Sequence, residues 1–195
     1  MGCGKSKEGL SKVDLDYLKA NTKYDKKAIE EWYTGFKKDC PDGKLTKDRF
    51  TDIFKVFFPY GNADEFVNHF FRTVDIDKNG FIDFKEFILA MNVINAGTAE
   101  EKLKWAFKMY DVGGNGKIYQ DEMKKIVQAM SDMHGVGAKK PDDVSAEEHV
   151  NDIFAKMDKN CDGHISIDEF LKGCLQDDYI RQLSIDSTKS RDLCS

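Results

Sequence analysis

Apolar residues recur along this chain at helical spacing, in stretches separated by short acidic segments that contain glycine. Ile29, Trp32, Tyr33 and Phe36 stand at positions i, i+3, i+4 and i+7, which places them on one face of a helix. A similar stripe runs from residue 50 to residue 58, another runs from 66 to 71, and more apolar residues follow in the later stretches. The pattern predicts an all-α protein in which pairs of helices flank polar loops.

The acidic segments are copies of one 12-residue pattern. "DIDKNGFIDFKE" (75–86, loop 2) and "DKNCDGHISIDE" (158–169, loop 4) both match D-x-[DN]-x-[DN]-G-x5-E without a gap. Calcium takes six to eight oxygens at about 2.3–2.6 Å, and this spacing offers them from positions 1, 3, 5, 7, 9 and 12, with glycine at position 6 for the turn. A solvated acidic turn is the alternative, but two complete copies between predicted helices favour calcium sites. The predicted ligands are Asp75, Asp77, Asn79, the Phe81 carbonyl, Asp83 and Glu86 in loop 2, and Asp158, Asn160, Asp162, the His164 carbonyl, Ser166 and Glu169 in loop 4.

A third copy, "DVGGNGKIYQDE" (111–122, loop 3), lacks one ligand. Its predicted ligands are Asp111, Asn115, the Lys117 carbonyl and Glu122, while Gly113 stands at position 3 and offers no side-chain oxygen. Two carboxylates remain, against four in loop 2 and three in loop 4. Affinity follows ligand charge and loop rigidity, so we expect a weakened third site that binds calcium after the other two.

The fourth copy, "KDCPDGKLTKDR" (38–49, loop 1), keeps the turn but not the ligands. Gly43 holds position 6 and Leu45 holds position 8, whereas Lys38 and Arg49 stand where the first and last carboxylates belong. We expect no calcium at loop 1.

Four successive helix–loop–helix units, or EF-hands, are therefore predicted over residues 25–60, 62–97, 98–133 and 145–180. EF-hands pair through their position-8 residues, which predicts short two-stranded bridges between Leu45 and Ile82 and between Ile118 and Ile165. Two paired lobes follow, with Thr98 as the N-cap of the helix that opens the second lobe. The polar stretch 134–149 is predicted to be a mobile loop, and residues 183–195 a C-terminal tail.

Composition narrows the classes of function. The net charge of −5 disfavours nucleic acid as a partner. No apolar run is long enough to span a membrane and no secretory signal is evident, so we expect a cytoplasmic protein. We also expect a monomer or weak dimer. Five scattered cysteines without a C-x-x-C pair suggest neither a zinc site nor a disulfide framework.

The first residues carry an acylation signal. "MGCGKS" matches M-G-x-x-x-[ST], which predicts myristoylation of Gly2, and the adjacent Cys3 would allow a second, palmitoyl chain. Lys5, Lys7 and Lys12 would add attraction to anionic lipid, so reversible membrane association is expected. The alternative is a solvated basic tail.

The aromatic residues of the first lobe have two interpretations. They belong either to the core that every EF-hand pair needs, or in part to a groove that opens on calcium binding and receives an amphipathic helix of a target protein. A hand that is retained without metal ligands fits a binding platform better than a calcium buffer.

The chain resembles the neuronal calcium sensor family, which includes recoverin, visinin, hippocalcin and frequenin. The resemblance rests on "DCPDGKLT", "FFPYG", "DFKEFILAM" and "EKLKWAFKMYD" and covers about residues 8–185. It implies a silent first hand, a calcium–myristoyl switch, and swivel points at Gly43 and Gly97. The residues that match the family's target groove are Trp32, Phe36, Phe50, Ile53, Phe54, Phe57, Phe87 and Met91. Gly113 departs from the family, which usually has Asp there.

These observations predict a calcium sensor, not an enzyme, that regulates a membrane-associated kinase, cyclase or channel. A cytosolic calcium buffer without a groove is the alternative. An enzyme ranks low, because none of the four histidines accompanies a recognisable nucleophile or set of metal ligands.

Overall fold

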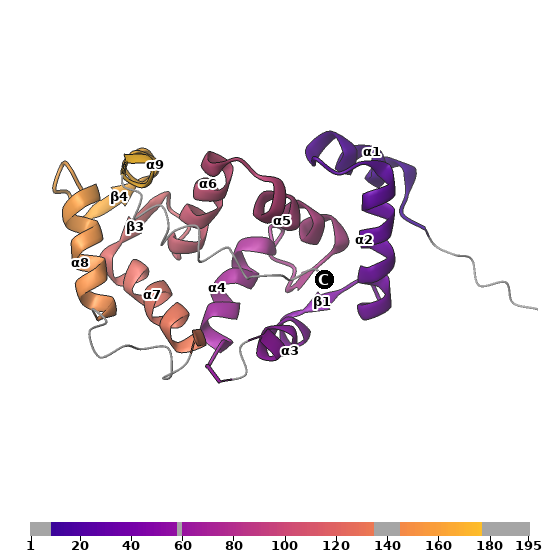
Figure 1. Ribbon diagram of the computed structural model, residues 1–195, viewed down its shortest axis with the longest axis horizontal. Coiled ribbons are helices and arrows are strands. Elements are labelled where there is room, and N and C mark those ends of the chain that lie inside the picture. The colour runs from indigo at the N-terminus through magenta and orange to yellow at the C-terminus, as the bar shows by residue number, and fades with distance from the viewer. Residues whose placement is uncertain (1–8, 58–59, 135–144, 177–195) are drawn as a thin grey trace, which may run out of the picture.

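A computed structural model describes residues 9–57, 60–134 and 145–176, and these residues form nine helices and four short strands. The helices are arranged as two lobes side by side along the long axis of the molecule (Figure 1). The predicted all-α fold with small strand bridges is confirmed. Gly2, Cys3 and the tail 183–195 lie outside the described residues, as does the stretch 135–144 of the predicted loop 134–149. The end of that predicted loop is wrong, because Ser145 caps a helix that begins at Ala146.

The first lobe holds loops 1 and 2. Its elements are α1 (Lys12–Asn21), α2 (Lys26–Asp39), β1 (Leu45–Thr46), α3 (Lys47–Phe57), α4 (Asp64–Val74), β2 (Phe81–Ile82) and α5 (Phe84–Ala96).

The second lobe holds loops 3 and 4. Its elements are α6 (Ala99–Tyr110), β3 (Lys117–Tyr119), α7 (Gln120–His134), α8 (Ala146–Met157), β4 (His164–Ser166) and α9 (Ile167–Gln176). Thr98 caps α6 as predicted, in a reciprocal capping box with Glu101.

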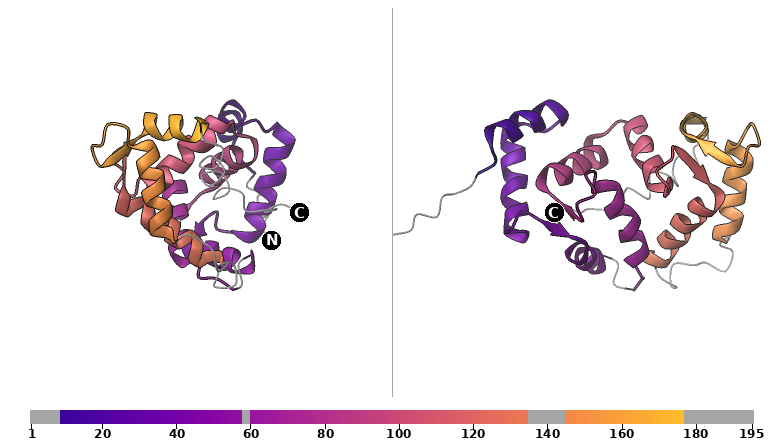
Figure 2. Two further views of the ribbon diagram at one scale, coloured as in Figure 1. Left: turned by 60° about the vertical axis from the view of Figure 1, so that its left-hand side comes forward. Right: turned by 180° about the vertical axis from the view of Figure 1, so that it is seen from behind.

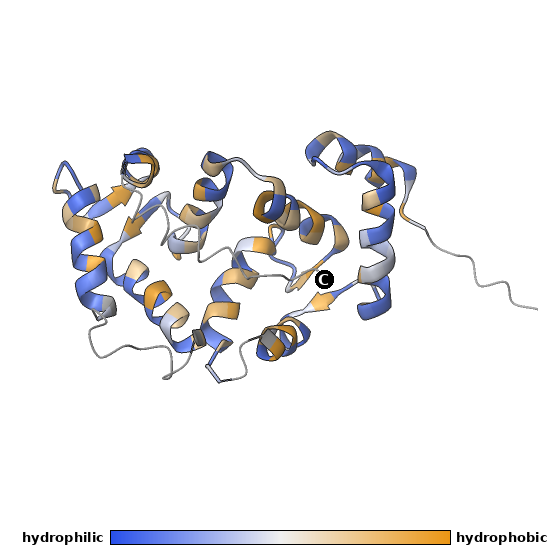
Figure 3. Cartoon of the chain, viewed as in Figure 1, coloured by the Kyte–Doolittle hydropathy of each residue, from blue (hydrophilic) through white to orange (hydrophobic). Residues whose placement is uncertain are grey.

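The loops pair through the residues at position 8. Leu45 lies opposite Ile82 in one antiparallel bridge, and Ile118 lies opposite Ile165 in the other, which confirms both predicted registers. All four side chains are buried. Figure 3 shows orange, hydrophobic positions beside blue, hydrophilic ones in the strands. The bridges thus join the two hands of each lobe through both backbone and core.

Helix α1 was not predicted. Ser11 caps its first turn by accepting a hydrogen bond from the Asp14 N–H, and Leu18 is fully buried. The turn after α1 contacts the end of α5, because Tyr24 Oη donates to the Met91 carbonyl at 3.2 Å and Lys23 Nζ donates to the Ala96 carbonyl. The turn after α1 is therefore anchored beside the connection between the lobes.

The two lobes share one continuous hydrophobic core. Helix α4 packs against both α6 and α7, and the Phe70 and Trp105 rings meet edge to face at a centroid distance of 5.1 Å. The backbone N–H of Asn62 also donates to the Asp132 carbonyl at the end of α7. Figure 2 shows α4 between the lobes from behind. Among the described residues, no helix is long and apolar enough to cross a membrane.

Candidate calcium loops and target groove

Loop 2 is held by its own carboxylates. Asp75 accepts hydrogen bonds from the Asn79 and Gly80 N–H groups, at 3.1 and 3.0 Å. Glu86, at position 12, accepts from the Ile76 N–H at 2.8 Å. Glu86 also forms a capping box with Asp83 at the start of α5. The side chains predicted to bind metal are thus already directed into the loop.

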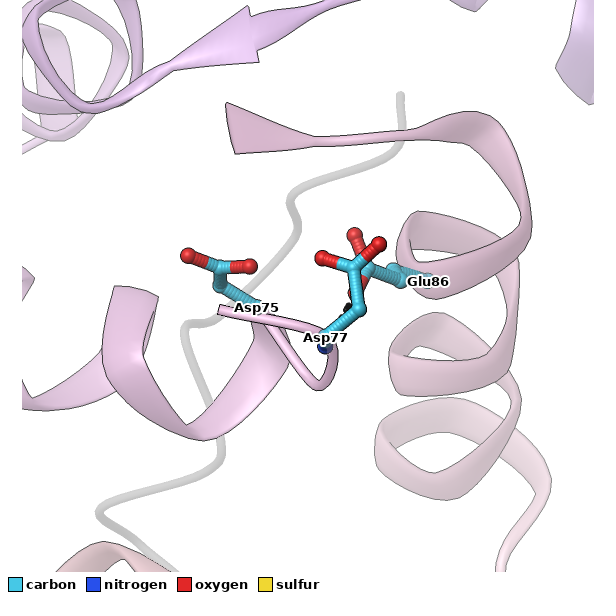
Figure 4. A group of neighbouring side chains, drawn as sticks. All are labelled: Asp75, Asp77 and Glu86. Carbon is cyan, nitrogen blue, oxygen red and sulfur yellow. Dashed lines mark hydrogen bonds between the residues drawn. The ribbon is translucent and has the colours of Figure 1, made fainter. Parts of the chain in front are cut away.

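The oxygens of loop 2 fit a calcium ion. One carboxylate oxygen from each of Asp75, Asp77 and Glu86 lies within 4.8 Å of the others, and Asp75 and Glu86 are buried. Figure 4 shows the three carboxyl groups on the same side of the loop. Ligands at about 2.3–2.6 Å from one ion are at most about 5 Å apart, so this donor set matches calcium in both spacing and hardness. Within residues 9–57, 60–134 and 145–176, no other group of three His, Cys, Asp or Glu side chains meets this spacing.

Loop 4 has the same hydrogen-bond pattern as loop 2, but its carboxylates are more exposed. Asp158 accepts from the Asp162 and Gly163 N–H groups, as Asp75 does in loop 2. Glu169 is only half-buried, and Ser166 holds it through its N–H and its hydroxyl, at 3.0 and 2.7 Å. These hydrogen bonds lower the pKa of Glu169, so its carboxyl is ionised and able to bind a cation. Asp162 is turned partly toward His164, whose Nδ1 lies 2.9 Å from its Oδ1.

Loop 3 keeps the same scaffold despite Gly113. Asp111 accepts from the Asn115 and Gly116 N–H groups at 3.0 and 2.8 Å. The Gly113 N–H donates to Glu122 at 2.7 Å, so position 3 still orients position 12 through its backbone. What loop 3 lacks at position 3 is a side-chain oxygen, not the geometry of the loop.

Loop 1 is held by cations of the protein itself. Arg49, at position 12, donates to the Asp39 carbonyl at 3.0 Å and lies 4.0 Å from an oxygen of Asp42. Lys37 donates to the Pro41 carbonyl at 2.6 Å. A guanidinium thus stands at the position from which Glu86 closes loop 2, which supports the prediction that loop 1 binds no calcium.

Glycine at position 6 has a conformational reason. Gly43, Gly80, Gly116 and Gly163 have φ between 77° and 85°, a left-handed conformation that side chains disfavour. Loop 1 therefore retains the calcium-loop turn without the ligands.

The predicted groove residues come together in the first lobe. A cavity of about 530 Å³ is bounded by α2, α3, α4 and α5 and by both strands of the bridge. Seven of the eight predicted residues line it: Trp32, Phe36, Phe50, Ile53, Phe54, Phe87 and Met91. The side chain of Phe57 lies outside the described part of the chain. Glu31 and Asp39 add acidic groups to a lining that is otherwise mostly apolar.

Gly97 lies between α5 and α6, where the lobes are connected. Its backbone is extended, and a Cβ there would stand 2.4 Å from the Val93 carbonyl oxygen. Close approach to α5 therefore requires glycine at this point. The roles of Gly43 and Gly97 as swivel points stay predictions.

Sequence reasoning missed two polar residues that hold these parts together. They are Tyr24, which donates a hydrogen bond to α5, and Arg72, which extends from α4 to the carbonyls at the end of α6. Arg49 was identified from its local signal, because it stands at position 12 in place of a ligand. Tyr24 and Arg72 act on segments distant in the sequence, so no local pattern indicates their partners.

Two pairs of EF-hands, with carboxylates that fit calcium in loop 2, define an EF-hand protein of the calcium-binding class. The pattern of the EF-hand domain pair matches residues 100–175, and that of the single EF hand domain matches residues 64–94. Neuronal calcium sensor 1 of Lymnaea stagnalis is 44% identical over 180 residues, which cover 92% of this chain and 94% of that protein. Neuronal calcium sensor 1 of Aplysia californica has the same identity and coverage. The chain belongs to the neuronal calcium sensor family, as its motifs predicted. Both relatives are named as calcium sensors, which fits the expectation that this protein is not an enzyme.

Proposed function

We propose that this chain is a calcium sensor that converts calcium binding in the first lobe into exposure of a groove for a target helix. The observation that carries the proposal is the position of the groove beside loop 2. Glu86, the last predicted ligand, is followed directly by Phe87, which lines the groove, and Ala90 and Met91 extend the same wall of α5. A ligand and a groove wall thus share one helix.

Calcium would act on this helix through Glu86. The ion supplies a double positive charge that draws the carboxylates of loop 2 together. Glu86 stands in the first turn of α5, so a shift of its carboxyl group carries the helix with it. Because Ile82 and Phe87 both line the groove, that shift changes its width.

Loops 2 and 4 are proposed as the main calcium sites, with weaker binding at loop 3 and none at loop 1. The number of carboxylates in each loop and the cation in loop 1 support this order.

The proposed partner is an amphipathic helix with an apolar face and basic flanks. The lining is mostly hydrophobic and aromatic, while Glu31 and Asp39 favour cationic side chains. Myristoylation of Gly2, with Cys3 as a second acylation site, would bring the protein reversibly to membranes where such a target resides. A kinase, cyclase or channel fits this description.

Co-sedimentation of the N-myristoylated protein with anionic liposomes, in calcium and in chelator, tests the proposal. Pelleting in calcium alone supports a calcium–myristoyl switch, and pelleting under both conditions means a constant anchor with calcium acting on the groove only. Gly2→Ala, which cannot be acylated, is the control. If the protein pellets in neither condition and an apolar dye does not respond to calcium, a cytosolic buffer becomes the better description.

A further inference from the structure

Arg72 connects the two lobes through a set of hydrogen bonds to main-chain carbonyls. Its Nη1 donates to the Asp111 carbonyl at 3.0 Å, and its Nη2 donates to the Met109 carbonyl at 2.8 Å and to the Lys108 carbonyl at 3.4 Å. These carbonyls belong to the last turn of α6 and to its C-cap, Asp111. The C-terminal end of a helix leaves acceptors unpaired and carries a partial negative charge. A guanidinium, with its rigid fork of donors, satisfies several of them at once.

The ends of this contact lie at two different calcium loops. Arg72 is three residues before Asp75, the first predicted ligand of loop 2, and both stand at the C-terminal end of α4. On the other side, Asp111 is the first predicted ligand of loop 3. The contact therefore joins the entry of loop 2 directly to the entry of loop 3, across the lobe interface.

The contact lies in a partly buried region between the lobes. Arg72 is half-buried, and its Nε is buried with no acceptor among the described residues. Close by on α4, Phe70 packs against Trp105 of α6. Burial lowers the pKa of Arg72, and the charges of Asp111 and Glu122 oppose that shift.

We propose that Arg72 is a positioning residue through which loop 2 tightens calcium binding at loop 3. Loop 3 has only two carboxylates and a glycine at position 3, so it gains most from being held in its binding geometry. Calcium at loop 2 stiffens the end of α4, which keeps the guanidinium on the Asp111 carbonyl and the first ligand of loop 3 in place. The inference rests on the proposed binding of calcium at both loops.

Calorimetric calcium titrations of four variants test the proposal. Glu169→Gln silences loop 4, and Glu86→Gln in addition silences loop 2, so the pair reports the affinity of loop 3 with loop 2 active or silent. The same pair is then made with Arg72→Met. With Arg72 present, silencing loop 2 is expected to weaken loop 3 by about 5- to 150-fold, the usual range for coupled sites. The ratio of the loop 3 affinities, with loop 2 active and with loop 2 silent, measures the coupling. With Arg72→Met, this ratio is expected to fall to about one.

Arg49→Met is the matched control, because Arg49 also donates to a loop carbonyl but stays within its own lobe. This substitution is expected to leave the ratio unchanged. Arg72→Lys keeps the charge but has no fork of donors, so it is expected to restore only part of the coupling. A merely structural role would lower the melting temperature of Arg72→Met without changing the ratio.

An equal ratio in the pair that keeps Arg72 and in the pair that carries Arg72→Met would overturn the proposal, as would a ratio of one in the presence of Arg72. If loop 3 is too weak to measure, Gly113→Asp is added to all four variants. Failure of loop 2 to bind calcium at all would instead refute the proposed function, so the two failures are distinguishable.

Discussion

Replacing Gly113 by Asp is expected to tighten the calcium step at loop 3. The structure has room for the side chain: a Cβ on Gly113 would stand 3.2 Å from Oε1 of Glu122 and 3.6 Å from Nδ2 of Asn115. Both contacts are to the ends of flexible side chains, which can shift by a few tenths of an ångström. The new carboxylate would occupy the position that Asp77 has in loop 2.

The size of the effect follows from charges and distances. At about 2.4 Å from calcium and the dielectric constant of water, an added carboxylate is attracted by about 3.5 kcal/mol. In loop 2 the matching oxygens lie within 4.8 Å of one another, and at that distance each of two existing carboxylates repels the third by about 0.9 kcal/mol. In the metal-free loop the side chain can turn away, so this repulsion opposes binding. The remainder, about 1.7 kcal/mol, corresponds to about 15- to 20-fold in affinity.

Isothermal titration calorimetry of the unsubstituted chain and of Gly113→Asp measures the effect directly. One step is expected to tighten, while the number of sites stays the same. Gly113→Asn is the matched control, because it adds an oxygen of similar reach without the charge, and it is expected to give a smaller gain. If Gly113→Asp leaves the titration untouched, or if Asn equals Asp, the argument from carboxylate number is wrong.

Three further predictions concern single side chains. Glu86→Gln is expected to remove one calcium step in calorimetry, because an amide cannot supply the bidentate carboxylate of position 12. Tyr24→Phe is expected to lower the free energy of unfolding in urea by about 0.5–1.5 kcal/mol through loss of its hydrogen bond to α5, whereas the exposed Tyr17→Phe is expected to change nothing. Burial, with help from Arg72, lowers the pKa of His69 below its ordinary value of 6.5. The unfolded chain therefore takes up the proton first, so stability in urea is expected to fall as the pH drops below about 6.5 until the lower folded-state pKa is passed. His69→Gln removes this dependence if the reasoning holds.

The calcium loops could be predicted in detail because their information is local. Each loop places its ligands within 12 residues, and position 8 determines the pairing, so Leu45–Ile82 and Ile118–Ile165 followed from spacing alone. The groove could also be predicted from the sequence, because it is bounded by helices with clear apolar stripes. Seven of its eight predicted residues line one cavity.

The connections between segments could not be predicted in the same way. Helix α1 has apolar residues on its exposed side as well, because Val13 and Tyr17 are exposed while Leu18 is buried, so these residues form no single apolar stripe. Tyr24 and Arg72 bind carbonyls that lie 67 and 37 residues away along the chain. A carbonyl is present in every residue, so the sequence does not indicate which one a distant side chain will reach.

The retention of a first hand that lacks the calcium ligands is consistent with these contacts. Phe36, Phe50 and Phe54 come from the helices of hand 1 and form one side of the groove, while α5 of hand 2 forms another. Hand 1 is held by Arg49 and by its bridge to Ile82, neither of which depends on calcium. Hand 2 closes on calcium through Glu86 in the proposed mechanism. In this arrangement the groove helices of hand 1 are held by Arg49, and only α5 of hand 2 moves when calcium binds, so the width of the groove changes. If both hands depended on calcium, neither side of the groove would be held in place once calcium dissociates. The loss of ligands in loop 1 is therefore compatible with sensing and gives the groove a constant frame.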